Sequence, residues 1–127
     1  MSRRLCSALA AIALAPCLQA EPVSFSSDIV PLLKSRCVMC HMPGAELGEL
    51  ALHPRGGHSN LVSVPSSQST LMRVEPGQPE ASYLYLKLVG NHSEVGGSGE
   101  RMPFGESPLG DTELELIRRW IESGAEP

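Results

Sequence analysis

Apolar residues recur at helical spacing in three stretches of the chain, with long polar segments between them. The first stretch covers residues 28–36, where Pro31 is compatible with a helix because it falls in the first turn. The second covers residues 79–89 and is followed by Gly90, a typical stop signal. Together with a third stretch near the C-terminus, this pattern predicts an all-α domain of about three helices.

The third stretch carries the clearest local signals for a helix. Gly110 is expected to cap its start, with Glu113 in the first turn and Leu109 packed against Leu114, and Gly124 marks its end. We expect its broad apolar face to pack across the first helix; this face consists of Leu114, Leu116, Ile117, Trp120 and Ile121.

Residues 1–20 have the features of a secretory signal peptide. Arg3 and Arg4 precede an apolar run that is too short for a transmembrane helix, and Ala20 suits the residue before cleavage. A proline directly before Cys17 makes a lipid anchor there a poor fit. We therefore expect residues 21–127 to form a domain that is periplasmic or otherwise exported, with no membrane span once the signal is removed.

This domain has 107 residues (127 − 20) and few aromatic side chains, so an embedded cofactor would supply buried surface that its core lacks. Loss of Arg3 and Arg4 leaves 8 basic against 14 acidic residues, a formal charge of −6. Such a charge disfavours nucleic acid as a partner and favours a protein with a basic docking face. Acidity that only keeps an exported protein soluble is the alternative explanation.

Residues 37–41 have the sequence C-V-M-C-H, the signature of covalent c-type haem attachment. In this interpretation Cys37 and Cys40 form thioether links to one haem c, and His41 is the proximal ligand of its iron. The other two cysteines lie within residues 1–20 and leave with the signal peptide, so no thiol remains for a disulfide framework.

The same cysteines also fit the zinc-finger spacing C-x2-C-x12-H-x4-H, with His53 and His58 as the other two ligands. A finger needs both histidines on one helix, whereas Pro54 and two glycines lie between them. A redox-active dithiol would need a βαβ setting. A structural zinc module stays open as an alternative.

Residues 42–77 are rich in Gly, Pro and Ser and contain only brief apolar runs. We expect an ordered loop wrapped over the haem, with at most short extended pieces. His53 and His58 are expected to be exposed to solvent in this loop.

Glycines before residue 102 and Pro103 after it allow the chain to approach a flat cofactor closely and to hold one side chain there. That side chain is Met102, whose thioether is the soft ligand that commonly completes a c-type haem. His58 and His92 are the competing candidates for the distal position.

The motif at residues 37–41, the loop at Met102 and the terminal helix resemble a mono-haem, class I-like cytochrome c. Further segments are similar to a bacterial family related to planctomycete-type cytochrome c domains, namely Gly48-Glu49-Leu50, Leu61-Val62, Val64-Pro65-Ser66, Arg73-Val74-Glu75-Pro76-Gly77, Ser82-Tyr83-Leu84, Lys87-Leu88 and Trp120-Ile121. The resemblance implies the cytochrome c fold, iron ligation by His41 and Met102, and export. One departure is Met42, where many relatives have glycine.

We therefore expect an electron carrier that passes single electrons between a redox-protein donor and acceptor and that catalyses no bond formation. Two alternatives stay open besides the zinc module. A haem-based sensor of small ligands would need an open distal position, and the domain would also suit a haem subunit of a larger oxidoreductase.

Overall fold

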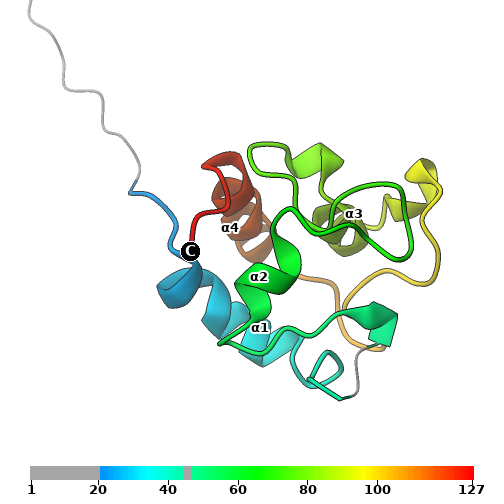
Figure 1. Ribbon diagram of the computed structural model, residues 1–127, viewed down its shortest axis with the longest axis horizontal. Helices are drawn as coiled ribbons and strands as arrows, with labels where there is room; N and C mark the ends of the chain where they lie inside the picture. Colours follow the sequence, from blue (N-terminus) through cyan, green and yellow to red (C-terminus); the bar gives the residue numbers. More distant parts are fainter. Residues whose placement is uncertain (1–20, 45–46) are drawn as a thin grey trace, which may run out of the picture.

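Regular structure in the chain consists of α-helices and short 3-10 or π-helical turns. The computed structural model describes residues 21–44 and 47–127, and the signal peptide expected at residues 1–20 lies outside this part. In chain order the elements are η1 (Phe25–Ile29), α1 (Val30–Arg36), η2 (Leu47–Glu49), α2 (Gly57–Leu61), η3 (Pro79–Ala81), α3 (Tyr83–Val89), η4 (His92–Val95) and α4 (Asp111–Glu122). The described residues form isolated β-bridges but no sheet, so the expected helical class is confirmed as a small, mostly helical domain (Figure 1). No helix in these two ranges is long and apolar enough to cross a membrane.

The first helical segment begins earlier than predicted, in the π-helical turn η1. The Asp28 carboxylate accepts a hydrogen bond from the Ser24 amide at 2.8 Å, which stabilises this turn ahead of α1. Phe25 and Ile29 are buried, so core packing extends the helical segment toward the N-terminus. As predicted, α1 ends directly before Cys37.

The second predicted helix, residues 79–89, is divided in two. Ser82 has an extended backbone (φ −97°, ψ 113°) that separates η3 from α3. Its buried hydroxyl accepts a hydrogen bond from the Glu75 amide at 2.9 Å and donates one to the Gln78 carbonyl at 2.8 Å. Because these side-chain bonds compete with helical backbone bonds, the helix is interrupted at this serine.

Residues 42–77 are mostly irregular, as predicted, but they also contain the single turn α2, which the prediction of only short extended pieces missed. The Asn60 side chain in this turn donates to the Ala51 carbonyl at 2.9 Å. Gly57 at its start packs against Leu52, whose carbonyl oxygen would lie 3.4 Å from an added Cβ. Tertiary contacts, rather than helical periodicity, therefore produce this turn.

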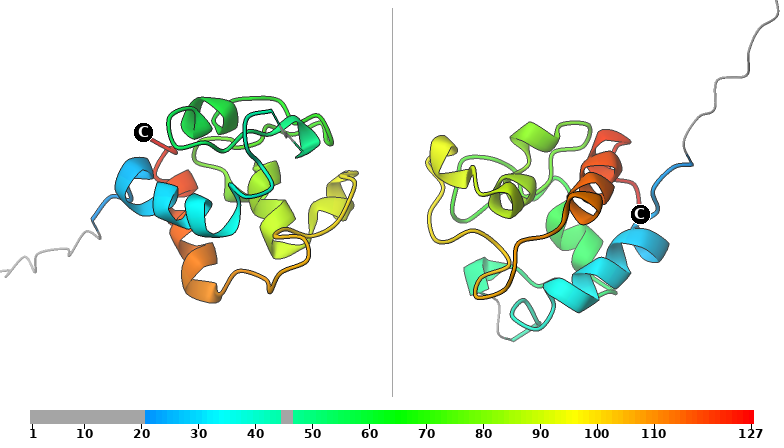
Figure 2. Two further views of the ribbon diagram at one scale, coloured as in Figure 1. Left: turned by 90° about the horizontal axis from the view of Figure 1, so that it is seen from below. Right: turned by 180° about the vertical axis from the view of Figure 1, so that it is seen from behind.

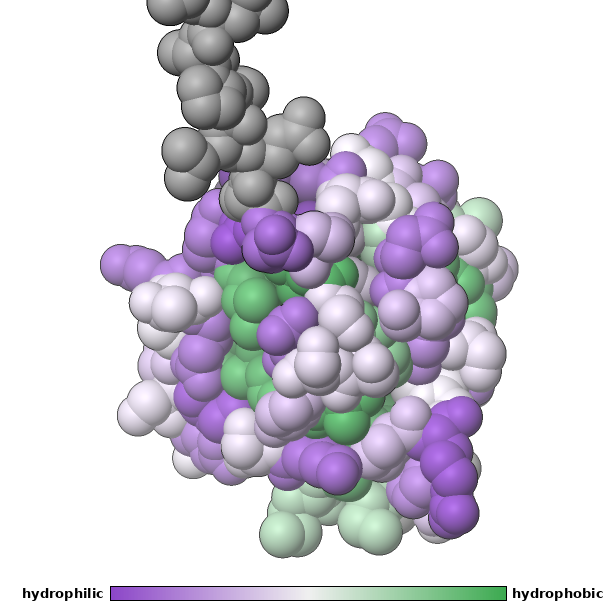
Figure 3. All heavy atoms as spheres, turned by 90° about the vertical axis from the view of Figure 1, so that its left-hand side faces the viewer, coloured by the Kyte–Doolittle hydropathy of each residue, from purple (hydrophilic) through white to green (hydrophobic). Residues whose placement is uncertain are grey.

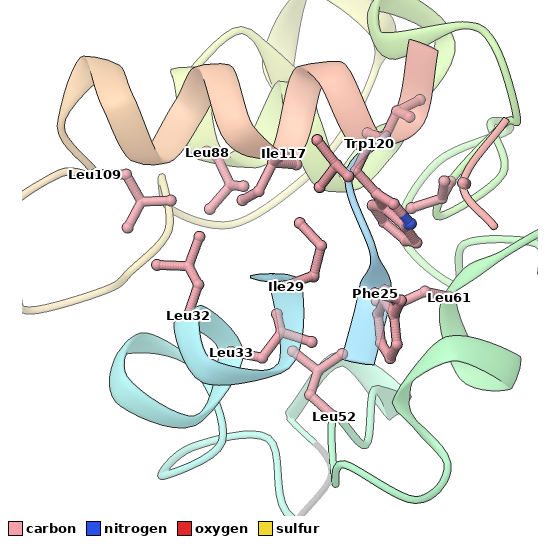
Figure 4. Packing of buried hydrophobic residues seen from close by; sticks show 14 residues of the cluster. Phe25, Ile29, Leu32, Leu33, Leu52, Leu61, Leu88, Leu109, Ile117 and Trp120 are labelled. Carbon is pink, nitrogen blue, oxygen red and sulfur yellow. The ribbon is translucent and has the colours of Figure 1, made fainter. Parts of the chain in front are cut away.

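α4 lies across η1 and α1, as predicted, and the side chains between them form the main hydrophobic core (Figure 4). Trp120 is fully buried, its ring centroid 5.2 Å from that of Phe25, and its Nε1 donates to the Glu126 carbonyl at 2.9 Å. Leu109, before α4, and Ile117, within it, point toward α1 in the same view. The core thereby fixes the direction in which α1 delivers residues 37–41.

Arg36 joins the end of α1 to the start of α4. Its Nη1 lies 3.1 and 3.0 Å from the two carboxylate oxygens of Glu113, its Nη2 donates to the Ser107 carbonyl at 2.6 Å, and its Nε lies 3.4 Å from the Glu106 carboxylate. Glu113 also accepts a hydrogen bond from the Gly110 amide at 2.9 Å, at the predicted start of α4. In the views of Figure 2, the chain after α3 returns to the end of α1 before it enters α4.

Arg36→Met should lower the free energy of unfolding by about 1–3 kcal/mol, because it removes several charge-assisted bonds from a side chain that is only 20% exposed. The matched control is Arg118→Met, whose partners Glu115 and Glu122 lie on the same exposed helix face and whose loss should cost about 0.5 kcal/mol or less. Denaturant unfolding of both variants checks this, and equal losses would contradict it.

Candidate functional site

Two cavities, of about 170 and about 240 Å³, lie where the end of α1 meets α3 and the segment after η4. Cys37, His41, Leu47 and Met102 line both cavities, so the two adjoin. The structure therefore brings the thiol and the imidazole of the motif at residues 37–41 together with the thioether of Met102, which the sequence indicated separately.

The two cavities differ in their walls. Apolar residues of the first include Leu50, Leu52 and Leu84, and its polar lining residues are Ser66, Gln68, Arg73, Tyr83 and Lys87. The second cavity is lined by Cys40 and by Met39 and Phe104, whose exposed fractions are 86% and 70%. It therefore opens to the surface. Figure 3 shows apolar side chains reaching the surface at its lower edge, the part of the molecule that holds α1 in Figure 1.

A tight turn after α1 positions the thiols and the imidazole. The Cys37 amide donates to the Leu33 carbonyl at 2.9 Å, and the amides of Cys40 and His41 both donate to the Cys37 carbonyl, at 3.2 and 3.1 Å. Burial raises the pKa of the Cys37 thiol to about 11. Reactive C-x-x-C motifs typically contain a thiol with a lowered pKa, and the pKa of Cys37 is shifted in the opposite direction.

One ring nitrogen of His41 is held by the backbone. Its Nδ1 lies 3.2 Å from the Leu50 carbonyl oxygen, which can only accept, so Nδ1 carries the proton. The His41 carbonyl in turn accepts the Leu52 amide at 2.7 Å. A carbonyl on Nδ1 leaves the lone pair on Nε2 and fixes the ring orientation, which is the arrangement usual for a metal-ligating histidine.

Met102 reaches the cavities from the segment after α3. Its amide donates to the Lys87 carbonyl at 3.0 Å, and the preceding Arg101 donates through Nε to the Leu88 carbonyl at 2.9 Å. Two carbonyls in the last turn of α3 are therefore paired with this segment, and the Met102 side chain is half-buried beside the core.

The remaining histidines do not line either cavity. His58 is in α2, half-buried, with Nε2 donating to the Ala125 carbonyl at 2.7 Å and its ring edge-on to Phe25 at 5.1 Å, so the expectation of an exposed loop residue is wrong. His53 is also half-buried and its Nδ1 accepts from the Arg55 amide at 3.3 Å.

His92, the other competitor for the distal position, is buried and directed elsewhere. Its Nε2 donates to the Gly99 carbonyl at 2.8 Å. The structure also does not form the zinc site that the zinc-finger spacing would require. Across residues 21–44 and 47–127, no three His, Cys, Asp or Glu side chains come close enough to hold a metal ion. Cys37, Cys40, His53 and His58 are therefore not assembled into a zinc site.

Nothing in the sequence analysis assigned a role to Arg73 and Lys87, the two cationic residues that line the first cavity. Arg73 donates to the carbonyls of Asn60 and Glu49, each at 2.8 Å. Lys87 is 6% exposed, and burial lowers the pKa of its ammonium. The sequence feature that could have indicated a role for Lys87 is its place inside the apolar run of residues 83–89. A lysine buried there needs polar partners elsewhere in the chain.

The donor set suits a haem. A half-buried thiol, an imidazole with a free Nε2 and a thioether share a largely apolar cavity, and an arginine and a lysine are among its lining residues. Comparisons of the chain with protein-family models, with curated proteins and with solved structures found no match.

If His58 is a packing residue, His58→Ala should lower the free energy of unfolding by about 1–2 kcal/mol, because a hydrogen bond and an aromatic contact are lost. It should leave the zinc content of the purified protein unchanged. His53→Ala, the matched control, should cost less because it removes one long bond. Stoichiometric zinc that disappears in both variants would contradict this assignment.

Proposed function

We propose that the chain is an exported, periplasmic c-type cytochrome with the cytochrome c fold, which carries single electrons on one covalently bound haem c. The observation that carries this proposal is that Cys37, His41 and Met102 line one cavity, although Met102 lies far along the chain from the other two. When bound, the haem supplies the one-electron redox centre. The residues of the chain hold it, orient it and exclude water from it.

Each residue of the motif has a distinct part in this proposal. Cys37 and Cys40 would hold the haem through thioethers, and His41 would bind its iron through Nε2 while the Leu50 carbonyl holds Nδ1. Met102 would supply a second protein ligand to the iron. An iron bound by two protein ligands in this way would suit electron transfer better than bond-making chemistry.

Polar residues that line the first cavity would suit the haem propionates. Arg73 is one of them, and the carbonyls of Asn60 and Glu49 each engage one of its nitrogens, which fixes the orientation of the guanidinium. Tyr83 is buried beside it and carries a hydroxyl. A guanidinium fixed in this way gives charge-assisted hydrogen bonds to carboxylates, so it would neutralise and orient the propionates.

The mouth of the second cavity is where we expect a redox partner to dock. Met39 and Phe104 are exposed there, and Glu100 and Glu106 lie beside them. With the chain's acidic balance, these features favour a partner that has an apolar contact patch and a basic rim.

Covalent attachment is the first test. Denatured protein purified from the periplasm should keep a haem stain on a gel, because both thiols are alkylated. Cys37→Ala should weaken the linkage and the Cys37→Ala, Cys40→Ala double variant should abolish it, while His53→Ala, outside the motif, should retain it. Haem that extracts fully from the wild type into acidified organic solvent would refute the proposal.

Thioether ligation is the second test. Ferric wild-type protein should show the weak far-red absorption band of iron–methionine bonding, and Met102→Ala should abolish it, lower the reduction potential and open the iron to carbon monoxide. Met72→Ala is the matched control, since Met72 lines neither cavity. A wild type that lacks the band and binds carbon monoxide quickly would point to the ligand sensor instead.

A further inference from the structure

Three successive backbone carbonyls before Met102 accept hydrogen bonds from side chains of α3 and η4. The Lys87 ammonium donates to the carbonyls of Ser98 and Glu100, at 2.8 and 2.7 Å. The carbonyl between them, that of Gly99, accepts from His92 Nε2 at 2.8 Å. The Tyr83 hydroxyl adds a longer bond of 3.3 Å to the Ser98 carbonyl.

These hydrogen bonds hold a glycine-rich segment whose own sequence permits many backbone conformations. Residues 96–99 include three glycines, and Gly96 and Gly99 have positive φ, a region that favours glycine. Gly97 is packed so tightly that an added Cβ would lie 2.5 Å from Tyr83 Cε2 and 2.6 Å from the His92 carbonyl oxygen. The segment is therefore held by side chains and by close contact, without regular secondary structure of its own.

Lys87 is the central member of this group. The residue is 6% exposed and, among the described residues, its ammonium forms no ion pair with a carboxylate. A buried charge is costly unless hydrogen bonds compensate it, so an apolar residue would fill this position of α3 at lower cost. The Lys87 carbonyl also accepts the Met102 amide at 3.0 Å. One residue thus contacts the segment both before and at Met102.

We propose that Lys87 is a positioning residue that holds Met102 at the cavity by binding the carbonyls of Ser98 and Glu100. This inference rests on the proposed function, in which Met102 is the distal ligand. Without the ammonium, residues 98–100 lose their shared donor, and the Met102 thioether is free to leave the cavity. The distal face then opens although the ligand itself is unchanged.

Lys87→Met tests this in the haem-loaded protein, because methionine keeps the length of the side chain and removes its donors. The far-red thioether band should be lost, carbon monoxide should bind the ferrous protein at least tenfold faster, and deuterium exchange in residues 96–103 should speed up at least tenfold. At a fixed solution potential, the ratio of ferric to ferrous protein should rise at least tenfold. For a one-electron couple this corresponds to a reduction potential that is lower by 59 mV or more. Lys87→Arg, which keeps the charge and still offers N–H donors, should retain the band.

Lys34→Met is the matched control, since it removes the same charge from an exposed site on α1 and should leave all four readouts unchanged. If Lys87→Met retains the band and binds carbon monoxide like this control, the positioning role is refuted while the proposed function stands. A wild type without covalent haem or without the band refutes the proposed function first, and the positioning role falls with it.

Gly97→Ala decides the question if Lys87→Met does not yield folded protein. The added Cβ has no room against Tyr83 and should push the segment off α3, with the same loss of the band and faster carbon monoxide binding. Gly56→Ala is its control, because the nearest atom to an added Cβ there is 3.8 Å away and its φ is negative. A Gly97→Ala protein that behaves like Gly56→Ala refutes the proposal.

Discussion

The crossing of α4 over η1 and α1 is the contact on which the rest of the structure depends. Trp120 and Ile29 are almost completely buried in it, and this shared apolar surface sets the direction of α1 and hence the place of residues 37–41. Arg36 fixes the distance between the end of α1 and the start of α4 through Glu113. The segment that carries Met102 leads into α4, so its far end is anchored by the same contact.

The domain is thus built from two halves of different character. One half is the packed core between the helices, and the other is a pair of cavities whose walls are largely irregular chain. Irregular chain has many backbone groups without helical partners, and here side chains satisfy them: Arg73 binds the carbonyls of Asn60 and Glu49, and Asn60 binds that of Ala51. Fixed polar side chains therefore replace secondary structure around the cavity.

The sequence predicted what depends on local signals and missed what depends on distant contacts. The caps and apolar periodicity of α4 and the end of α1 were predicted correctly, because neighbouring residues determine them. The break at Ser82 was missed because it follows from bonds to Glu75 and Gln78 across a turn. The prediction that His58 is exposed in a loop was wrong for the same reason, since its hydrogen-bond partner Ala125 lies far from it in the sequence, near the C-terminus.

The candidate site shows the same division. Residues 37–41 and Met102 were indicated by motif and loop composition, but glycines before Met102 indicated only that the chain could approach a cofactor. The segment before Met102 is held in place by Lys87 and His92, which bind its backbone carbonyls. No pattern in the sequence indicates which carbonyls these two side chains bind. A glycine-rich segment of this kind is permissive in conformation and depends on its neighbours for order. Lys87, within an apolar run, therefore helps to order a loop that lies more than ten residues further along the chain.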